Sequence, residues 1–134
     1  MTKKILLKNK LQAILIKKKD LSKSKGINFF TSNKLPFQIA SMKHKKGHKI
    51  SAHIHQKFLR KIYSTSEALI VFKGSIKVNF YNQKNIIFKN LLIKAGDIIL
   101  FFQGSHGFEI KKDAHFVEVK QGPYFKKMDK KLIK

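Results

Sequence analysis

The fold is indicated most clearly by the run Glu67-Ala-Leu-Ile-Val-Phe-Lys-Gly-Ser-Ile-Lys-Val-Asn-Phe-Tyr81. Branched aliphatic and aromatic residues dominate both halves of this run, and polar residues separate Val78 from Phe80, as is typical of strands. Gly74-Ser75 in the middle matches a tight hairpin turn with glycine first. The run therefore predicts two strands, 67–73 and 76–81, joined by a hairpin.

Similar short apolar runs, separated by Gly, Asn, Asp and Ser, occur along the whole chain. They predict further strands at 12–16, 27–31, 37–42, 50–55, 60–63, 85–92, 97–102, 108–111 and 116–120. The first twenty residues fit either a short helix or two strands. The pattern predicts an all-β barrel or sandwich. We expect a single domain over residues 1–134, with its core at about 37–124 and a basic tail, helical or frayed, at 125–134.

The charge balance is strongly basic, with 30 Lys and Arg against 7 Asp and Glu and a formal net charge of +23. Arg60 is the one arginine, and the lysines are spread along the chain. Lys, Ile, Asn and Phe all have A/T-rich codons, so codon composition explains much of the charge. We expect loose, salt-sensitive binding of polyanions and no specific nucleic-acid recognition. Polyanion binding is therefore the least favoured of the candidate functions.

No apolar run approaches the length of a membrane-spanning helix. Residues 1–15 are basic, and Lys8 and Lys10 interrupt their apolar stretch. No small-residue cleavage site follows them. We therefore expect a soluble, cytoplasmic protein.

The histidines are the strongest sign of chemistry. In Gly47-His-Lys-Ile-Ser-Ala-His53-Ile-His55, alternation along a strand would place His53 and His55 on one face, where two imidazoles can bind one metal ion. Glu67 and His106, in the run Gly104-Ser-His106-Gly107, are the candidates to complete the set. The chain has no cysteine, so only nitrogen and oxygen ligands are available. Each candidate also has a simpler explanation. His53 and His55 could face solvent, Glu67 could be a surface carboxylate paired with a lysine, and His106 could cap a backbone group in a turn.

These residues resemble the cupin motifs. The first motif is Gly, five residues, His-x-His, a short gap, Glu, six residues and Gly, and Gly47, His53, His55, Glu67 and Gly74 follow it. Eleven residues, 56–66, replace the usual gap of three or four, which suits an added hairpin. In the second motif Gly96 and Gly104 are in place, Phe102 replaces the proline, and His106 arrives one residue early.

Four segments add a closer resemblance to small bacterial cupins associated with surface-polysaccharide and nucleotide-sugar genes. They are Thr65-Ser-Glu67-Ala-Leu-Ile-Val, Asn79-Phe-Tyr81, Gly104-Ser-His106-Gly-Phe-Glu109 and Glu118-Val-Lys-Gln-Gly-Pro-Tyr124. The resemblance implies a double-stranded β-helix, the cupin jelly-roll barrel, and a homodimer. It also implies one divalent transition metal ion held by His53, His55, Glu67 and His106, and the ligand set fits Fe, Mn, Ni, Co and Zn alike.

Three other residues are candidates for catalysis. Glu118 and Lys120 share one face of a strand and could reach the barrel mouth or form an outer ion pair. Arg60 could bind a carboxylate or phosphate with its planar fork, although a simple salt bridge explains it equally well. We expect a metal-dependent enzyme acting on a sugar or sugar nucleotide, such as an isomerase or epimerase. The alternative is a cupin that binds a small ligand without turnover.

Overall fold

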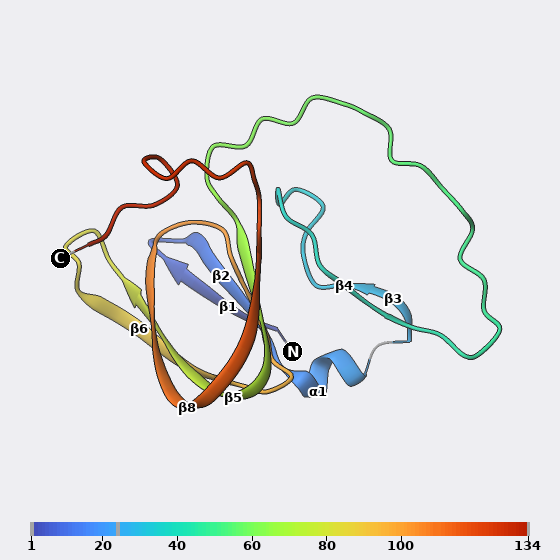
Figure 1. Ribbon diagram of the computed structural model, residues 1–134, viewed down its shortest axis with the longest axis horizontal. Helices are drawn as coiled ribbons and strands as arrows, with labels where there is room; N and C mark the ends of the chain where they lie inside the picture. Colours follow the sequence, from blue (N-terminus) through green and yellow to red (C-terminus); the bar gives the residue numbers. More distant parts are fainter. Residues whose placement is uncertain (1, 24, 134) are drawn as a thin grey trace.

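The computed structural model describes residues 2–23 and 25–133, and its two longest strands form one bent antiparallel ribbon (Figure 1). Strand β5 (Glu67–Tyr81) pairs with β8 (Ser105–Lys120) from Glu67↔Lys120 to Tyr81↔Ser105. Both strands bend midway, so their four ends come together at one end of the barrel-like sheet. We call this the open end, and the bends mark the closed end.

The prediction of a hairpin at Gly74-Ser75 is wrong. The chain bends there, but 67–73 and 76–81 belong to one strand, and both halves pair with β8 and not with each other. Gly74 has φ +78°, and a Cβ at this position would collide with the carbonyl oxygen of Asp113 on β8. Glycine therefore permits a bend with close backbone contact, where the sequence suggested a reversal of direction. The strands predicted at 108–111 and 116–120 likewise form one strand, β8.

Four more strands complete the main sheet, in the order β1-β2-β7-β5-β6. Strands β1 (Lys3–Leu7) and β2 (Lys10–Ile16) show that the first residues form two strands and not a helix. Strand β7 (Ile98–Phe101) pairs with β2 and with the start of β5, and β6 (Ile87–Lys94) pairs with the second half of β5. The all-β class is confirmed, and the sheet pairings are antiparallel.

A short helix, α1 (Lys18–Ser22), leads to a separate two-stranded sheet of β3 (Gly26–Phe29) and β4 (Ala40–Lys43). Residues between these two strands, including Phe30, Phe37 and Ile39, pack against one face of the main sheet. The strands predicted at 27–31 and 37–42 therefore exist in shortened form.

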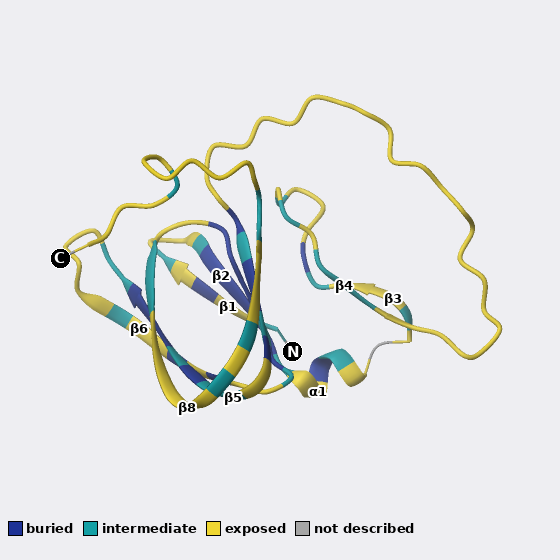
Figure 2. Cartoon of the chain, in the orientation of Figure 1, coloured by how far each residue is buried: buried dark blue, intermediate teal, exposed yellow. Residues whose placement is uncertain are grey.

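The core follows the alternation of the strands (Figure 2). On β5, Leu69, Val71, Ile76 and Val78 are buried inside the bent sheet, together with Phe101 of β7. The other face of β7 and β2 is buried beneath the 30–39 segment. Strand β1 and strand β2 also contribute core residues, so the core begins well before residue 37.

Residues 44–66 contain no strand, so the strands predicted at 50–55 and 60–63 are wrong. The segment runs as a wide loop away from the sheets (Figure 1), and most of its residues are exposed. Its last residues are held to the barrel, because Ser64 donates a hydrogen bond to the Phe102 carbonyl (3.1 Å) and Ser66 N–H donates one to Gln121 (2.9 Å).

The tail beyond β8 contains a turn at 125–129, in which Asp129 N–H donates to the Phe125 carbonyl (2.8 Å), and no helix through residue 133. Lys134, the last residue of the predicted tail, lies outside the described residues. Within 2–23 and 25–133, no helix has the length and apolarity needed to span a membrane.

Candidate functional site at the open end of the barrel

Glu67 and His106 meet inside the open end. Glu67 begins β5 and lies on the same face as Leu69 and Val71, so its carboxylate points inward. His106 is the second residue of β8 and pairs with Phe80, another inward-facing residue. The His106 Nε2 lies 2.6 Å from the Glu67 Oε1, and both side chains are mostly buried. Two of the four predicted ligands are therefore brought together.

Aromatic rings hold the imidazole in place. The His106 ring stacks on Phe101, with centroids 4.1 Å apart and an interplanar angle of 20°, and Phe108 lies 5.4 Å away. A ring fixed in this way cannot rotate away from the Glu67 carboxylate without losing the stack. The site is thus a carboxylate–imidazole pair on an apolar floor, where little water weakens their interaction.

The second ring nitrogen of His106 has no hydrogen-bond partner. Its Nδ1 is buried and, among the described residues, nothing bonds to it. If Nε2–H donates to Glu67, then Nδ1 carries a lone pair that can accept a proton or bind a metal ion. A buried nitrogen without a partner costs about 1–3 kcal/mol, so a group that binds it is favoured.

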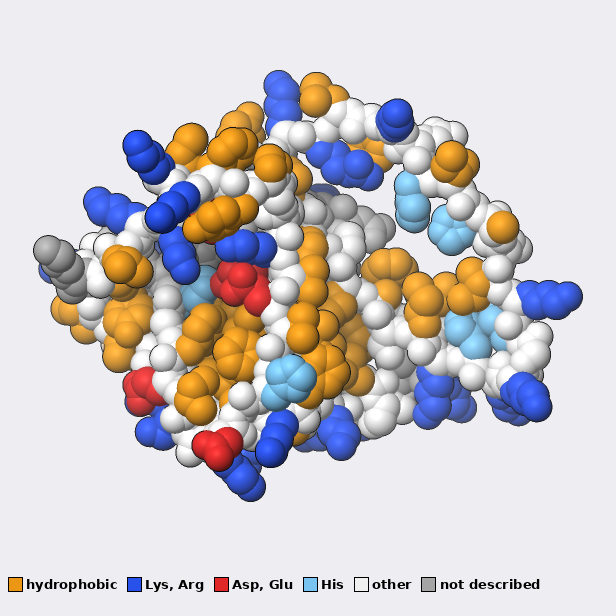
Figure 3. All heavy atoms as spheres, viewed as in Figure 1, with side chains coloured by type: hydrophobic (Ala, Val, Ile, Leu, Met, Phe, Trp, Pro, Cys, Tyr) orange, Lys and Arg blue, Asp and Glu red, His pale blue; other side chains and the backbone are white. Residues whose placement is uncertain are grey.

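Charged residues of β8 and the tail surround this pair. Lys120 pairs with Glu67 across the strands and donates a hydrogen bond to the Asp129 carboxylate (2.8 Å), and Glu118 lies 3.7 Å from the same ammonium group. The hydrogen bond that Lys120 donates to Asp129 raises the pKa of Lys120, and the charges of Asp129, Glu118 and Glu67 raise it further against the opposing effect of desolvation. In Figure 3, carboxylates in red lie beneath lysines in blue and above hydrophobic side chains between the arms of β8.

His53, His55 and Arg60 are not at the open end, because all three lie on the exposed 44–66 segment. The rings of His53 and His55 meet edge to face at 5.2 Å, and His53 Nδ1 contacts the Ser51 carbonyl at 3.0 Å. The Arg60 guanidinium lies over the Phe58 ring at 3.6 Å. The two histidines still neighbour each other, but the strand alternation used to align them is absent.

The metal fit is therefore partial. Within the described residues, no three His, Cys, Asp or Glu side chains lie close enough together to hold one metal ion. The Glu67–His106 separation of 2.6 Å is near the distance of about 3 Å between adjacent ligands at about 2.1 Å from a metal. Glu67 and His106 could therefore bind one metal ion after a small shift, whereas His53 and His55 could join them only if the 44–66 segment moved. The metal set as a whole stays a prediction.

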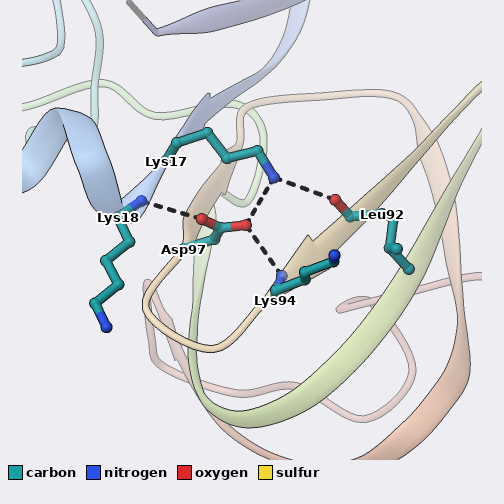
Figure 4. Close-up of polar contacts among 5 residues, drawn as sticks. All are labelled: Lys17, Lys18, Leu92, Lys94 and Asp97. Carbon is teal, nitrogen blue, oxygen red and sulfur yellow. Dashed lines mark hydrogen bonds and ion pairs between the residues drawn. The ribbon is translucent and has the colours of Figure 1, made fainter.

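A second carboxylate, Asp97, lies at the closed end and is fully engaged (Figure 4). Its Oδ1 accepts a hydrogen bond from the Lys18 N–H (3.0 Å). Its Oδ2 accepts one from the Lys94 N–H (3.0 Å) and one from the Lys17 ammonium (2.8 Å). Asp97 therefore ties the end of β2 and the start of α1 to the turn between β6 and β7.

Sequence reasoning missed Phe101, Asp129 and Gln121 at the open end. Phe101 lies in the predicted strand 97–102, and no sequence signal shows that it also supports an imidazole. Asp129 is one of seven acids in a basic chain, which could have marked it as a partner for a lysine. Gln121 accepts the Ser66 N–H through its side chain, a long-range contact that no local pattern predicts.

Comparison of the chain with models of protein families, with curated proteins and with solved structures finds no match. Function is therefore inferred from its own residues and their contacts.

Proposed function

We propose that the protein is a metal-binding cupin that acts on a sugar or sugar nucleotide, as an isomerase or epimerase of surface-polysaccharide synthesis. The contact between Glu67 and His106 carries this proposal, because it joins two distant motif positions inside the open end of the barrel. The polysaccharide setting and the sugar substrate come from the resemblance in sequence.

The proposed fold is the double-stranded β-helix of cupins. The bent β5–β8 ribbon supports it, because it brings the ends of both strands to one mouth above a closed hydrophobic interior. The long gap after His55 corresponds to the exposed 44–66 segment, where the resemblance suggested an inserted hairpin.

The proposed metal site forms when this segment closes over the mouth. Twelve residue steps separate His55 from Glu67, and an extended chain of that length spans about 40 Å, so His53 and His55 can reach the mouth. The segment carries apolar side chains with nothing to pack against, such as Ile54 (88% exposed) and Tyr63 (94% exposed). Strand β8 pairs only with β5 among the described strands, so its other edge is open to an added strand.

The bound metal would supply Lewis acidity toward a substrate oxygen. The chain's own residues provide the rest of the chemistry. With Nε2 and the Glu67 carboxylate holding the metal, His106 would carry its proton on Nδ1, so the proton acceptor would be Glu118, whose carboxylate lies 3.7 Å from the Lys120 ammonium group. Lys120 carries a positive charge beside the pair and can hold an anionic group of the substrate. An isomerase or epimerase needs this combination of a positioned base and a fixed cation.

Metal analysis of protein purified without a histidine tag tests the site. About one equivalent of a transition metal should survive dialysis, and it should be lost in His106→Ala and in the double variant His53→Ala/His55→Ala. His115→Ala is the matched control, because this exposed β8 histidine lies against Phe72 and away from the mouth. Wild-type protein that binds no metal after reconstitution would rule out the metal site.

A screen against sugar nucleotides in deuterated water separates an enzyme from a ligand-binding module. An isomerase or epimerase should exchange a substrate C–H proton with solvent, and Glu67→Gln should slow this exchange more than His115→Ala. Saturable binding without exchange or conversion would favour the non-catalytic cupin.

A further inference from the structure

A cavity lies on the outside of the open end, where three turns meet. Its volume is about 240 Å³, and it is lined by residues 7–8 of the β1–β2 turn, 81–83 after β5 and 103–105 before β8. The β1–β2 and β7–β8 turns lie near each other in Figure 1. At about 30 Å³ per water, the cavity has room for about eight waters, which suits a ligand of monosaccharide size.

The lining has the chemistry of an anion site with additional hydrogen-bonding groups. Lys8 and Lys10 are both among the lining residues, and none of the lining residues is acidic. Four amide side chains and Tyr81 add groups that both donate and accept, as ligand hydroxyls require. In a chain this basic, lysines alone are weak evidence for a ligand site. Their combination with four amides around one cavity is stronger evidence.

Backbone contacts already fix the amides. The Gln12 Nε2 donates to the Lys10 carbonyl (3.0 Å), and the Gln103 Nε2 donates to the Leu11 carbonyl (2.8 Å). The Asn82 Oδ1 accepts from the backbone N–H groups of Lys84 and Ile86 (2.9 and 3.1 Å). Three of the four amides, those of Gln12, Gln103 and Asn82, are thereby held in one orientation, so binding orders few side chains.

Two backbone features preserve this arrangement. Gly104 has φ +85°, and a Cβ there would collide with the Oε1 of the buried Gln12, so glycine leaves the amide its place. Lys8 and Asn9 form the tight β1–β2 turn with φ +48° and +62°. Asn suits such a conformation but Lys does not, so Lys8 occupies the turn against the preference of its backbone.

We propose that this cavity binds a small hydroxylated anion, such as a sugar phosphate or a sugar acid. The ammonium groups of Lys8 and Lys10 hold the phosphate or carboxylate, and the amides of Gln12 and Gln103 hold hydroxyls. The site shares no residue with the proposed metal set, so it stands or falls separately from the metal site.

Calorimetric titration of the full chain at physiological salt tests the proposal with four probes: glucose 1-phosphate, glucuronate, glucose and inorganic phosphate. One or both hydroxylated anions should bind saturably and more tightly than glucose or phosphate. Which of the two binds better identifies the anionic group. Phosphate binding as tightly as glucose 1-phosphate, or no saturable binding of either hydroxylated anion, would overturn the assignment.

Variants locate the binding. Lys8→Asn keeps a residue that tolerates the turn and should weaken binding about tenfold, the loss of one charge-assisted hydrogen bond. Lys84→Ala, at an exposed lysine of the neighbouring turn whose side chain does not line the cavity, should bind as the wild type does. Equal losses in both variants would mean generic attraction and refute the site. Glu67→Gln should leave the affinity unchanged, and a loss there would place the ligand in the barrel mouth instead.

Discussion

The two ends of the barrel each hold a largely buried carboxylate, and the contacts of the two differ. Asp97 at the closed end accepts three hydrogen bonds, two from backbone N–H groups and one from Lys17. Glu67 at the open end contacts His106, whose Nδ1 is buried without a partner. Both carboxylates are largely buried, so burial alone does not distinguish a structural acid from a functional one.

The difference lies in how many buried hydrogen-bonding atoms have partners around Asp97 and around the Glu67–His106 pair. A carboxylate whose acceptors all have partners within the chain stabilises the fold, because removing it leaves several buried donors unpaired. A pair with a remaining buried nitrogen can still gain a proton, a metal ion or a substrate atom. We therefore propose a structural role for Asp97 and a chemical role for the Glu67–His106 pair, and the following substitutions separate the two roles.

Asp97→Ala should have the largest effect on stability. It leaves the backbone N–H groups of Lys18 and Lys94 and the Lys17 ammonium without their acceptor, so the free energy of unfolding should fall by about 3 kcal/mol. Urea denaturation measures the loss. Asp113→Ala, at an exposed carboxylate of the same end, is the control and should change stability by less than about 0.5 kcal/mol. Equal effects would show that Asp97 is not the anchor.

Gly74→Ala should come next, with a loss of about 2 kcal/mol. The new Cβ meets the Asp113 carbonyl, and the backbone is left-handed at φ +78°. Gly47→Ala has a similar φ of +85° but open space around its Cβ, so it isolates the collision from the backbone preference. Chemical denaturation of both variants should rank Gly74→Ala as the more damaging. The reverse order would contradict the close approach of β5 and β8 at the bend.

Lys120→Met should have a smaller, pH-dependent effect. Because the Asp129 hydrogen bond raises the pKa of Lys120 above 10.5, the bond contributes stability below that pH and loses it as pH rises through the folded-state pKa. The wild type should therefore be more stable than the variant at neutral pH, with the difference shrinking as the pH rises above 10.5. A difference that stays constant over this range would mean that the lysine acts through packing alone.

Glu67→Gln should have the smallest effect on stability, less than about 1 kcal/mol, because an amide can still hydrogen-bond to His106. Asp97→Asn, the matching change at the closed end, should cost more, since its NH₂ group faces donors. Thermal unfolding of the two variants compares the ends directly. A larger loss for Glu67→Gln would make Glu67 a structural residue and weaken its functional assignment.

Much of the fold follows from local patterns. Strands β2 and β7 lie close to their predicted positions because they are continuous apolar runs, which fit a sheet covered on both faces. Strand β6 has the alternation of a strand covered on one face. The bend at Gly74 was misread because a glycine with positive φ serves a hairpin turn and a bent strand equally well. Only the distant β8, which pairs with both halves of β5, distinguishes the two.

The candidate site was predictable in part for a similar reason. Glu67 and His106 were identified from motif spacing, and the structure brings them together across 39 residues of sequence. His53 and His55 were expected on a strand because residues 50–55 alternate, but alternation forms a strand only where a neighbouring strand supplies hydrogen bonds. The contribution of Asp129 depends on the tail folding back, which no local pattern encodes.

Titration of ¹⁵N-labelled protein with Mn²⁺, followed by NMR, tests the central claim most directly. We predict that one saturable site broadens the amide signals of Glu67, His106, His53 and His55 together, while those of Asp97 and Asp113 at the closed end stay sharp. Saturable broadening confined to residues 44–55, or strongest around Asp97, would contradict the assignment of chemistry to the open end.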